Sequence, residues 1–263
     1  MASQLPRTAV DLFCGAAAGW TLGLHWAGVT VVAGCEADPA RAAAWRARWG
    51  RYVHHDIKTM GPHNTSSPWL LCGSPPCKGI SEVNHKGNGV DDDGLFFEAI
   101  RLGAALRESD GGPDWLALEN VSRLRTRGAD RVLAAMEAAG FEPLEPIVVG
   151  SAEAGKDHDR QRVFLIASNP AGREGRPARQ PRATLGCAAA RRHDIAGPED
   201  RRARLAHLGP EALSCHLRAY DGVSDRVADF ARGAFGDAVD PLLPNLIARG
   251  LIAWEEGDRR SAV

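Results

Sequence analysis

Short apolar runs recur along the first two thirds of the chain, and stretches with helical spacing of apolar residues separate them. The runs predict strands over residues 8–13, 29–35, 53–57, 69–72, 115–118, 146–150 and 163–167. Helices are expected up to Ala27 and over 39–49, 94–107 and 129–139, the second of them starting at Pro39. This alternation predicts an α/β fold with a doubly wound, mostly parallel sheet.

The pattern changes after residue 168. Residues 169–218 contain few apolar positions and many arginines, namely Arg173, Arg176, Arg179, Arg182, Arg191, Arg192, Arg201, Arg202 and Arg204. An apolar, helix-like pattern returns over 223–253. We therefore expect a catalytic and cofactor-binding α/β domain over 1–168 and a small arginine-rich recognition lobe or loop over 169–218. The segment 219–263 would return to the first domain.

Composition narrows the class of protein only slightly. The formal net charge is −1, so any nucleic-acid partner must be inferred from local patches. None of the six cysteines forms a Cys-x-x-Cys pair, which argues against a zinc site. No signal peptide is visible and no apolar run approaches the roughly 20 residues that a membrane span needs. Free thiols in a reducing cytoplasm are expected.

Several polar residues follow directly after predicted strands, at the sheet edge where α/β proteins bind ligands. Gly15 and Gly19 could let backbone N–H groups approach a ligand, or could serve only tight packing. Glu36 is placed to accept hydrogen bonds from ribose hydroxyls, although an acid before a helix is also favoured by the helix dipole. Asp56 could bind an adenine amino group or be a solvated loop acid.

The sequence feature that most specifically indicates a catalytic site is Gly73-Ser74-Pro75-Pro76-Cys77. Two prolines hold the thiol of Cys77 on a rigid loop, where a thiolate could act as a nucleophile, while the alternative is an inert thiol. Glu119, Arg160 and Arg162 follow later in the chain. A thiolate, an acid and a guanidinium together suit addition to a pyrimidine, although Glu119 could be a loop acid and the arginines a solvated pair.

The ordered motifs of the chain resemble those of cytosine-C5 DNA methyltransferases. They are Asp11-Leu-Phe-Cys-Gly15, Glu36, Asp56-Ile57, Ser74-Pro-Pro-Cys77, Leu95-Phe-Phe-Glu98, Glu119-Asn-Val121, Arg160-x-Arg162 and Gly236-x-Ala-Val239. Their order and spacing match from the first strand to the last helix, and only about 169–218 lacks a counterpart. The short length and Asp221-Gly-Val-Ser-Asp-Arg226 are similar to compact phage or prophage members.

The resemblance implies S-adenosylmethionine as cofactor and double-stranded DNA as substrate. Cys77 would attack C6 of a flipped cytosine, Glu119 would contact N3 and N4, and Arg162 would contact O2. Arg160 would position this loop and a backbone phosphate. The implied cofactor-binding residues are Phe13, Gly15, Gly19, Glu36, Asp56, Ile57, Pro76, Asp237, Ala238 and Val239.

Two departures from the family pattern leave alternatives open. The turn Gly15-Ala-Ala-Ala-Gly19 is one residue longer than usual and lacks a glycine, and Asp237 replaces an asparagine. The alternatives are a cytosine-C5 alkyltransferase with a modified donor, a catalytically impaired DNA-binding relative, and an enzyme acting on RNA or nucleotides. A monomer in a bacterial or phage-infected cytoplasm is expected, taking part in restriction–modification or phage protection.

Overall fold

The computed structural model describes residues 6–76, 94–150, 161–171 and 239–261, with residues 257–261 described by their backbone alone. The strands are β1 Thr8–Leu12, β2 Thr30–Cys35, β3 Tyr52–His54, β4 Leu70–Gly73, β5 Trp115–Val121, β6 Glu142–Pro143, β7 Ile147–Gly150 and β8 Gln161–Ser168. The helices are α1 Gly19–Trp26, α2 Pro39–Trp49, α3 Leu95–Asp110, the 3-10 helix η2 Ser122–Thr126, α4 Ala129–Ala138 and α9 Leu242–Ser261.

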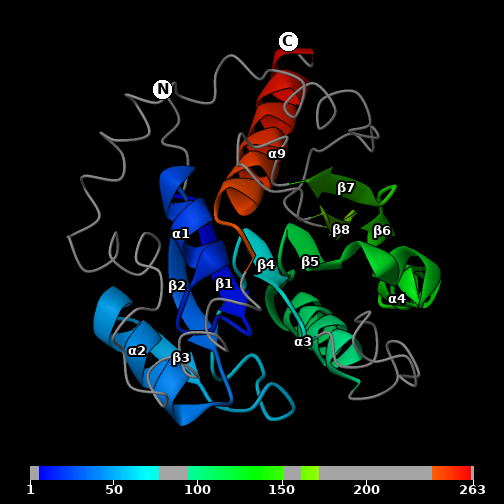
Figure 1. The fold of residues 1–263 in the computed structure, drawn as a ribbon. Coiled ribbons are helices and arrows are strands. Elements are labelled where there is room, and N and C mark those ends of the chain that lie inside the picture. Colours follow the sequence, from blue (N-terminus) through cyan, green and yellow to red (C-terminus); the bar gives the residue numbers. More distant parts are fainter. Residues whose placement is uncertain (1–5, 77–93, 151–160, 172–238, 262–263) are drawn as a thin grey trace.

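One sheet organises these elements (Figure 1). Its order is β3-β2-β1-β4-β5-β8-β6, and β7 also pairs with β8. The strands from β3 to β5 are parallel, whereas β8 is antiparallel to β5, β6 and β7. The predicted α/β, doubly wound and mostly parallel fold is confirmed, with an antiparallel end that the apolar runs alone could not reveal.

Most element bounds lie within three residues of those predicted, and the differences have local causes. The strand expected over 53–57 ends at His54, because Asp56 begins a turn closed by the Thr59 and Met60 N–H groups. In contrast, β5 runs on to Val121, since β8 pairs with it along its whole length. The elements β6 and η2 are too short for their spacing to predict them. Of the pattern expected over 223–253, residues 223–238 lie outside the described part of the chain.

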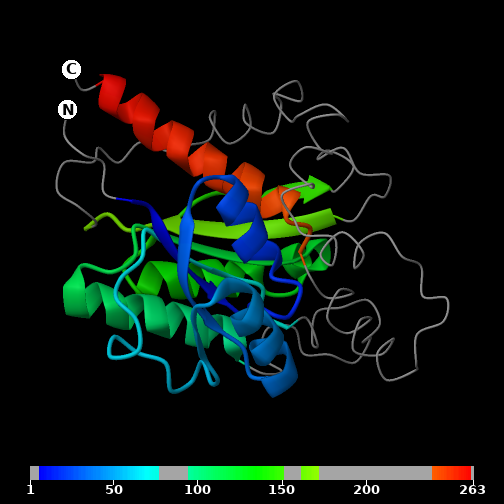
Figure 2. The same cartoon turned by 90° about the vertical axis from the view of Figure 1, so that its left-hand side faces the viewer.

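Helices cover both faces of the sheet (Figure 2). On one face α1 and α9 pack with Trp45 of α2 against β1 and β4, and on the other α3 and α4 bury residues such as Phe96 and Met136. Local signals define α2, because the side chain of Asp38 caps it through Arg41 N (2.9 Å) and Gly50 ends it with a positive φ. Within the described residues, no helix is both long and apolar enough to cross a membrane.

A buried carboxylate fixes the distal end of α9. Glu255 Oε1 accepts hydrogen bonds from the indole nitrogens of Trp69 (2.7 Å) and Trp115 (2.9 Å). Its second oxygen lies 3.4 Å from Nη2 of Arg7. These partners stand at or just before the amino ends of β1, β4 and β5, so Glu255 ties α9 to three parallel strands at once.

Glu255→Gln is expected to lower the free energy of unfolding by roughly 2–4 kcal/mol, since a partly buried cation and two buried indole N–H groups lose a charged partner. Denaturant unfolding of the two proteins measures this. Glu256→Gln is the matched control, because its side chain is 45% exposed and lies 3.6 Å from the same arginine. The control should change stability by no more than about 0.5 kcal/mol. Equal destabilisation by both changes would contradict this role for Glu255.

Candidate functional site

The described candidate residues gather at the carboxyl ends of the parallel strands. Phe13 follows β1, Glu36 follows β2 and Pro76 follows β4, while Glu119 lies near the end of β5. From β1 the chain adds β2 and β3 on one side of the sheet, and then β4 and β5 on the other side of β1. The strand order thus reverses between β1 and β4, and α/β folds bind ligands at such a switch point.

The turn between β1 and α1 is conformationally strained. Phe13 and Ala18 have φ values of 59° and 54°, which non-glycine residues rarely adopt. Such strain is found most often at binding sites and costs on the order of 1 kcal/mol for each residue. Ala18 therefore stands where a glycine would be unstrained. At Gly15, with φ +59°, a Cβ atom would meet nothing nearer than 4.0 Å.

Asp11 of β1 is buried and links this strand to α1 by hydrogen bonds. Its Oδ2 atom accepts hydrogen bonds from the backbone N (3.0 Å) and hydroxyl (2.5 Å) of Thr21 at the start of α1. The hydroxyl of Thr21 in turn accepts a hydrogen bond from Nε1 of Trp45 (3.0 Å). Burial raises the pKa of Asp11 to about 7, although the Thr21 bonds act in the opposite direction and Glu36 adds a smaller upward effect.

This raised pKa predicts a pH dependence of stability. The unfolded chain loses the Asp11 proton near the ordinary value of 3.8 and the folded chain keeps it to about 7, so stability falls as pH rises between these values. From pH 5 to pH 7 the contribution of Asp11 should fall by roughly 2 kcal/mol. Denaturant unfolding should show that the free energy of unfolding of Asp11→Asn falls less between pH 5 and pH 7 than that of the parent, by this amount. If the free energies of parent and variant change with pH in parallel, the prediction is wrong.

Two carboxylates stand at the ends of β2 and β3. Glu36 accepts the N–H groups of Gly15 (3.0 Å) and Asp38 (2.9 Å), one on each oxygen. Because an ionised carboxylate offers about four lone-pair sites, Glu36 retains capacity for a diol. Asp56 is exposed, and only its Oδ1 atom is engaged by the described residues, through Lys58 N (2.9 Å). The buried side chain of Ile57 follows it. These residues and the open Gly15 turn fit a nucleoside.

Gly19 serves a close contact within the chain. A Cβ atom there would lie 2.2 Å from the carbonyl oxygen of Val239, so the first residue of α1 touches the backbone just before α9. At Gly23, one turn later, a Cβ atom would lie 2.2 Å from the carbonyl oxygen of Pro241. The two glycines let the end of the chain lie directly on α1, which brings Val239 to the edge that holds Gly15.

Two hydrogen bonds hold the loop that leads to Cys77. Nε1 of Trp20 donates to Oγ of Ser74 (2.9 Å), and Nδ2 of Asn120 donates to the carbonyl of Pro75 (2.8 Å). Asn120 is itself fixed, because its Oδ1 atom accepts the N–H of Val121 (2.9 Å). The described residues after β4, 74–76, are thus fastened both to α1 and to the end of β5.

Glu119 and Arg162 form a buried ion pair beside this loop. Nε of Arg162 lies 2.8 Å from Oε1 of Glu119, and the two side chains are 10% and 3% exposed. Antiparallel pairing of β5 with β8 sets the pair, because Arg162 stands opposite Val121 in the register. Asn120, adjacent to Glu119, reaches the Pro75 carbonyl, so the acid, the guanidinium and the Pro-Pro turn share one end of the sheet.

The described cysteines are poor nucleophiles. Cys14, Cys35 and Cys72 are free and buried. Burial is the main cause that raises their thiol pKa values, with smaller contributions from nearby acids, and Cys35 is raised to about 12. A thiolate is the reactive form, so none of the three is poised for attack. Cys77, Arg160, Asp237 and Ala238 lie outside the described residues, as does the arginine-rich stretch 172–218.

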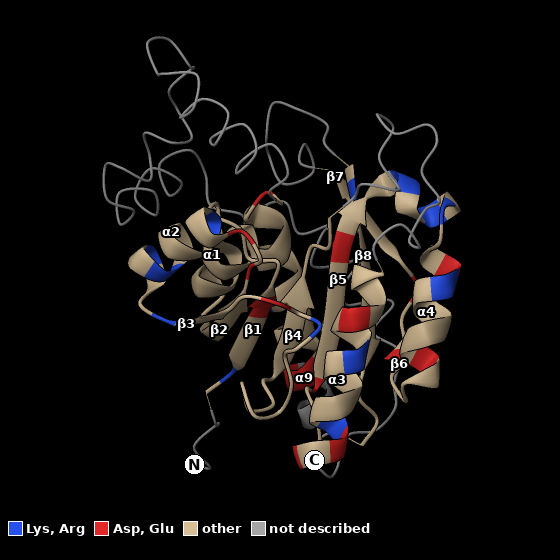
Figure 3. Cartoon of the chain, turned by 90° about the horizontal axis from the view of Figure 1, so that it is seen from below, with Lys and Arg blue, Asp and Glu red and all other residues tan. Residues whose placement is uncertain are grey.

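Sequence reasoning missed several residues that shape this site. The sequence pattern assigns no role to Trp20 or Asn120, because no local feature predicts their hydrogen bonds to Ser74 and Pro75. The arginines after β5 carried a readable signal, because Arg123, Arg125 and Arg127 alternate directly behind Glu119-Asn-Val121. They belong to η2 or its end, and Figure 3 shows basic residues on the stretch that leads into α4. Alternating guanidinium groups beside the site suit phosphates.

Comparisons with known proteins agree with this geometry. The family model described as C-5 cytosine-specific DNA methylase matches residues 7–182, more than half of the chain. The chain is 25% identical to the type II methyltransferase M.HgiDI of Herpetosiphon aurantiacus over 60% of its length, and 28% identical to M.SsoII of Shigella sonnei over 61%. These matches span only 50% and 42% of the two relatives.

Solved structures show the same fold. A Spodoptera frugiperda DNMT2 variant aligns with 94% of this chain and 99% of its own, with a TM-score of 0.59 and 14% identity. The Dnmt2 methyltransferase of S. pombe aligns over 63% of this chain and 50% of its own, with a TM-score of 0.51 and 15% identity. At such identities the likeness concerns the fold, here the α/β fold of S-adenosylmethionine-dependent methyltransferases.

Proposed function

The chain belongs to the C-5 cytosine-specific DNA methylase family, and from this premise we propose that it methylates carbon 5 of cytosine in double-stranded DNA. The observation that carries the proposal is that Pro75, two residues before Cys77, is bonded to Asn120, the chain neighbour of Glu119 in the buried Glu119–Arg162 pair. The family uses S-adenosylmethionine as methyl donor, and the open turn at Gly15 with Glu36 and Asp56 fits its nucleoside.

The chemistry requires a covalent adduct, because C5 of neutral cytosine is a poor nucleophile. In our proposal the Cys77 thiolate adds to C6, Glu119 takes up a proton and passes it to N3 as the adduct forms, and Arg162 donates to O2. The electron pair released toward C5 forms a bond to the methyl group that S-adenosylmethionine would supply, and the electron pair of the broken S–CH3 bond would stay on sulfur in S-adenosylhomocysteine. A base then removes the C5 proton, the C6–S bond breaks, and the thiolate is regenerated. The cytosine must leave the stack for the thiolate to reach it.

The ion pair explains why Glu119 and Arg162 can serve a neutral base. Burial would penalise either charge alone, but together they form a nearly neutral unit whose donors and acceptors keep fixed directions. Such a pair can hold the ring by hydrogen bonds without reorganising during the reaction. Phe13, held in a left-handed backbone conformation after β1, would stack on the adenine of the donor.

DNA is the partner that the family implies, and the arginines of η2 support this. Arg125 is exposed, and neither it nor Arg123 forms an ion pair with another described residue. These guanidinium groups begin four residues after Glu119, so they would contact the backbone flanking the target base. Arg160 and the arginine-rich lobe over 169–218 are expected to contribute further phosphate contacts. Monomeric state, cytoplasmic location and a role in restriction–modification or phage protection stay predictions.

The test is direct. The full chain, S-adenosylmethionine and double-stranded DNA are combined, and digested nucleosides are analysed by mass spectrometry, with RNA and free cytidine nucleotides in parallel. We expect 5-methylcytosine in DNA alone. A product in RNA or nucleotides only, or a different cytosine adduct with cell-extract cofactors, would overturn the proposal and favour the alternative substrates or donors. Binding of DNA without any product would identify an impaired relative.

A further inference from the structure

The turn after β3, which carries Asp56 and Ile57, depends on a partner from another part of the fold. Its first residue closes it, because the carbonyl of Asp56 accepts the N–H groups of Thr59 (3.0 Å) and Met60 (3.1 Å). The carboxylate of Asp56 caps it through Lys58 N. The Ile57 carbonyl also accepts a longer bond from the Met60 N–H (3.3 Å). The later carbonyl groups of a single turn lack donors within it and need donors from elsewhere in the fold.

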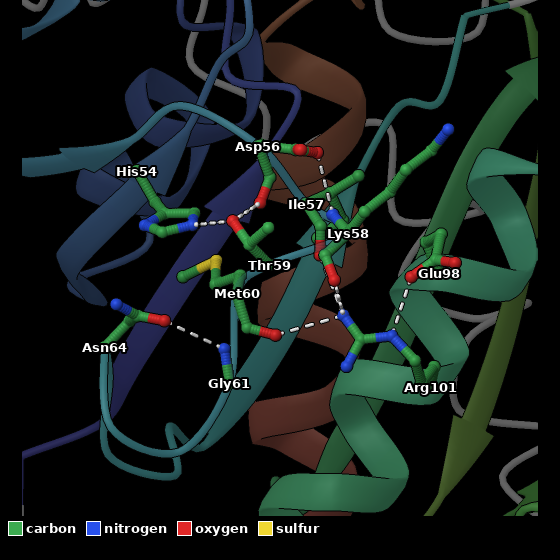
Figure 4. Close-up of polar contacts among 10 residues, drawn as sticks. All are labelled: His54, Asp56, Ile57, Lys58, Thr59, Met60, Gly61, Asn64, Glu98 and Arg101. Atoms are coloured by element: carbon green, nitrogen blue, oxygen red, sulfur yellow. Dashed lines mark hydrogen bonds and ion pairs between the residues drawn. The ribbon is translucent and has the colours of Figure 1, made fainter.

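Arg101 of α3 supplies those donors (Figure 4). Its Nη2 atom donates to the carbonyl oxygens of Ile57 (2.8 Å) and Met60 (3.0 Å), and it lies 3.4 Å from that of Lys58. Its Nε atom donates to Oε2 of Glu98 (2.6 Å), one turn earlier on the same helix. The planar guanidinium thus has one edge on the turn and the other on a carboxylate that fixes its orientation.

This contact sets the position of the two residues assigned to the adenine. The side chain of Ile57 is buried in the same apolar cluster as Leu12 and Phe96, so the turn cannot rotate without disturbing the core. Asp56 stays exposed with one oxygen available to accept a donor. The opposite side of the turn has a weaker support, in which Oγ1 of Thr59 lies 3.0 Å from Nε2 of the half-buried His54.

We propose that Arg101, oriented by Glu98, is a positioning residue for cofactor binding that holds the Asp56–Ile57 turn in the geometry that reads adenine. This rests on the proposed function, because it takes these two residues to contact the adenine. Arg101 acts through the turn and does not touch the reacting atoms. It should therefore govern affinity and base selectivity, while the transfer step depends on Glu119 and the loop after β4.

Arg101→Met tests this, with binding of S-adenosylhomocysteine measured by calorimetry. Loss of charge-assisted bonds to three carbonyl groups should weaken binding about tenfold. The rate at saturating S-adenosylmethionine should stay within about twofold. The matched control is Arg107→Met on the same helix, since Arg107 donates to Asn169 (3.2 Å) and the Ala139 carbonyl (3.4 Å) on the side away from this turn. The affinity of Arg107→Met for S-adenosylhomocysteine should equal that of the parent.

Base selectivity separates positioning from general loosening of the fold. The parent should prefer S-adenosylhomocysteine to S-inosylhomocysteine, in which a carbonyl replaces the adenine amino group that would donate a hydrogen bond to Asp56. Arg101→Met should lose most of that preference, and Asp56→Ala combined with Arg101→Met should add little to either single change. Glu98→Gln should give a smaller loss of the same kind, and it serves in place of Arg101→Met if that variant fails to unfold cooperatively.

The outcomes are distinct. Equal affinities for Arg101→Met and Arg107→Met, or a fall in the saturated rate with affinity and base preference intact, would overturn the role of Arg101 while leaving the proposed function standing. A parent protein that binds neither S-adenosylmethionine nor S-adenosylhomocysteine would remove the proposed function itself. Weaker binding with lost selectivity in the Arg101 and Glu98 variants supports the inference.

Discussion

Cys77→Ala is expected to lower the rate of methyl transfer to DNA by roughly 10⁴-fold or more, because no other group in the proposed site can add to C6 and activate C5. The described cysteines cannot substitute for it, since burial raises their thiol pKa values. The variant should also fail to form a denaturant-stable complex with DNA containing 5-fluorocytosine. Gel electrophoresis of the trapped complex and transfer of a labelled methyl group measure the two effects.

Cys72→Ala is the matched control for this experiment. Cys72 lies five residues earlier in β4, is fully buried, and its thiol lies 3.4 Å from the carbonyl oxygen of Val10. Its replacement removes a thiol from the same segment at a small cost in packing, and trapping should persist. Binding of DNA should be retained in both variants. A Cys77→Ala protein that methylates within tenfold of the parent would rule out the covalent mechanism.

Glu119→Gln should lower the transfer rate by roughly 10²–10³-fold, because an amide cannot share a proton with N3 as a carboxyl group does. It should also reduce the free energy of unfolding by roughly 2–4 kcal/mol, since Arg162 is left as a buried cation without its anionic partner. Steady-state kinetics and denaturant unfolding report on the two effects separately. Glu142→Gln, at an exposed position of β6, is the control and should change neither.

A double variant separates the structural from the catalytic part of this effect. In Glu119→Gln with Arg162→Met, the unpaired cation is gone, so much of the lost stability should return. Activity should stay low, because both contacts to the cytosine ring have been removed. If the double variant recovers activity together with stability, Glu119 and Arg162 are a structural pair and the assignment of the acid is wrong.

Local signals are sufficient for much of the fold. The bounds of α2 were predicted at Pro39 and Trp49, because Asp38, Pro39 and Gly50 determine a helix start and end through short-range contacts alone. The parallel strands are apolar on both faces and bounded by turns, which is a pattern that needs no partner to be recognised. Where pairing decides the length, as for β5 and β8, the predicted strands were too short.

The candidate site divides in the same way. The sequence gives directly the residue types that can attack, protonate and bind a pyrimidine. The order and spacing of the motifs are sufficient to propose Glu119, Arg162, Glu36 and Asp56 as site residues. Their partners could not be proposed in this way, because a hydrogen bond between Trp20 and Ser74, or between Asn120 and Pro75, joins positions 54 and 45 residues apart. Nothing in the local sequence of either member records the other.

By itself, then, the sequence determined the fold class, the family and the chemical groups available, because periodicity, caps and motif order are local properties. Only the tertiary structure decided that Gly19 and Gly23 admit the backbone before α9, that Arg162 faces Glu119, and that Arg101 reaches the turn of Asp56. Each of these three contacts depends on strand register, helix packing or the path of a loop. Register, packing and loop path form together when the chain buries one shared core, to which residues distant in the sequence contribute.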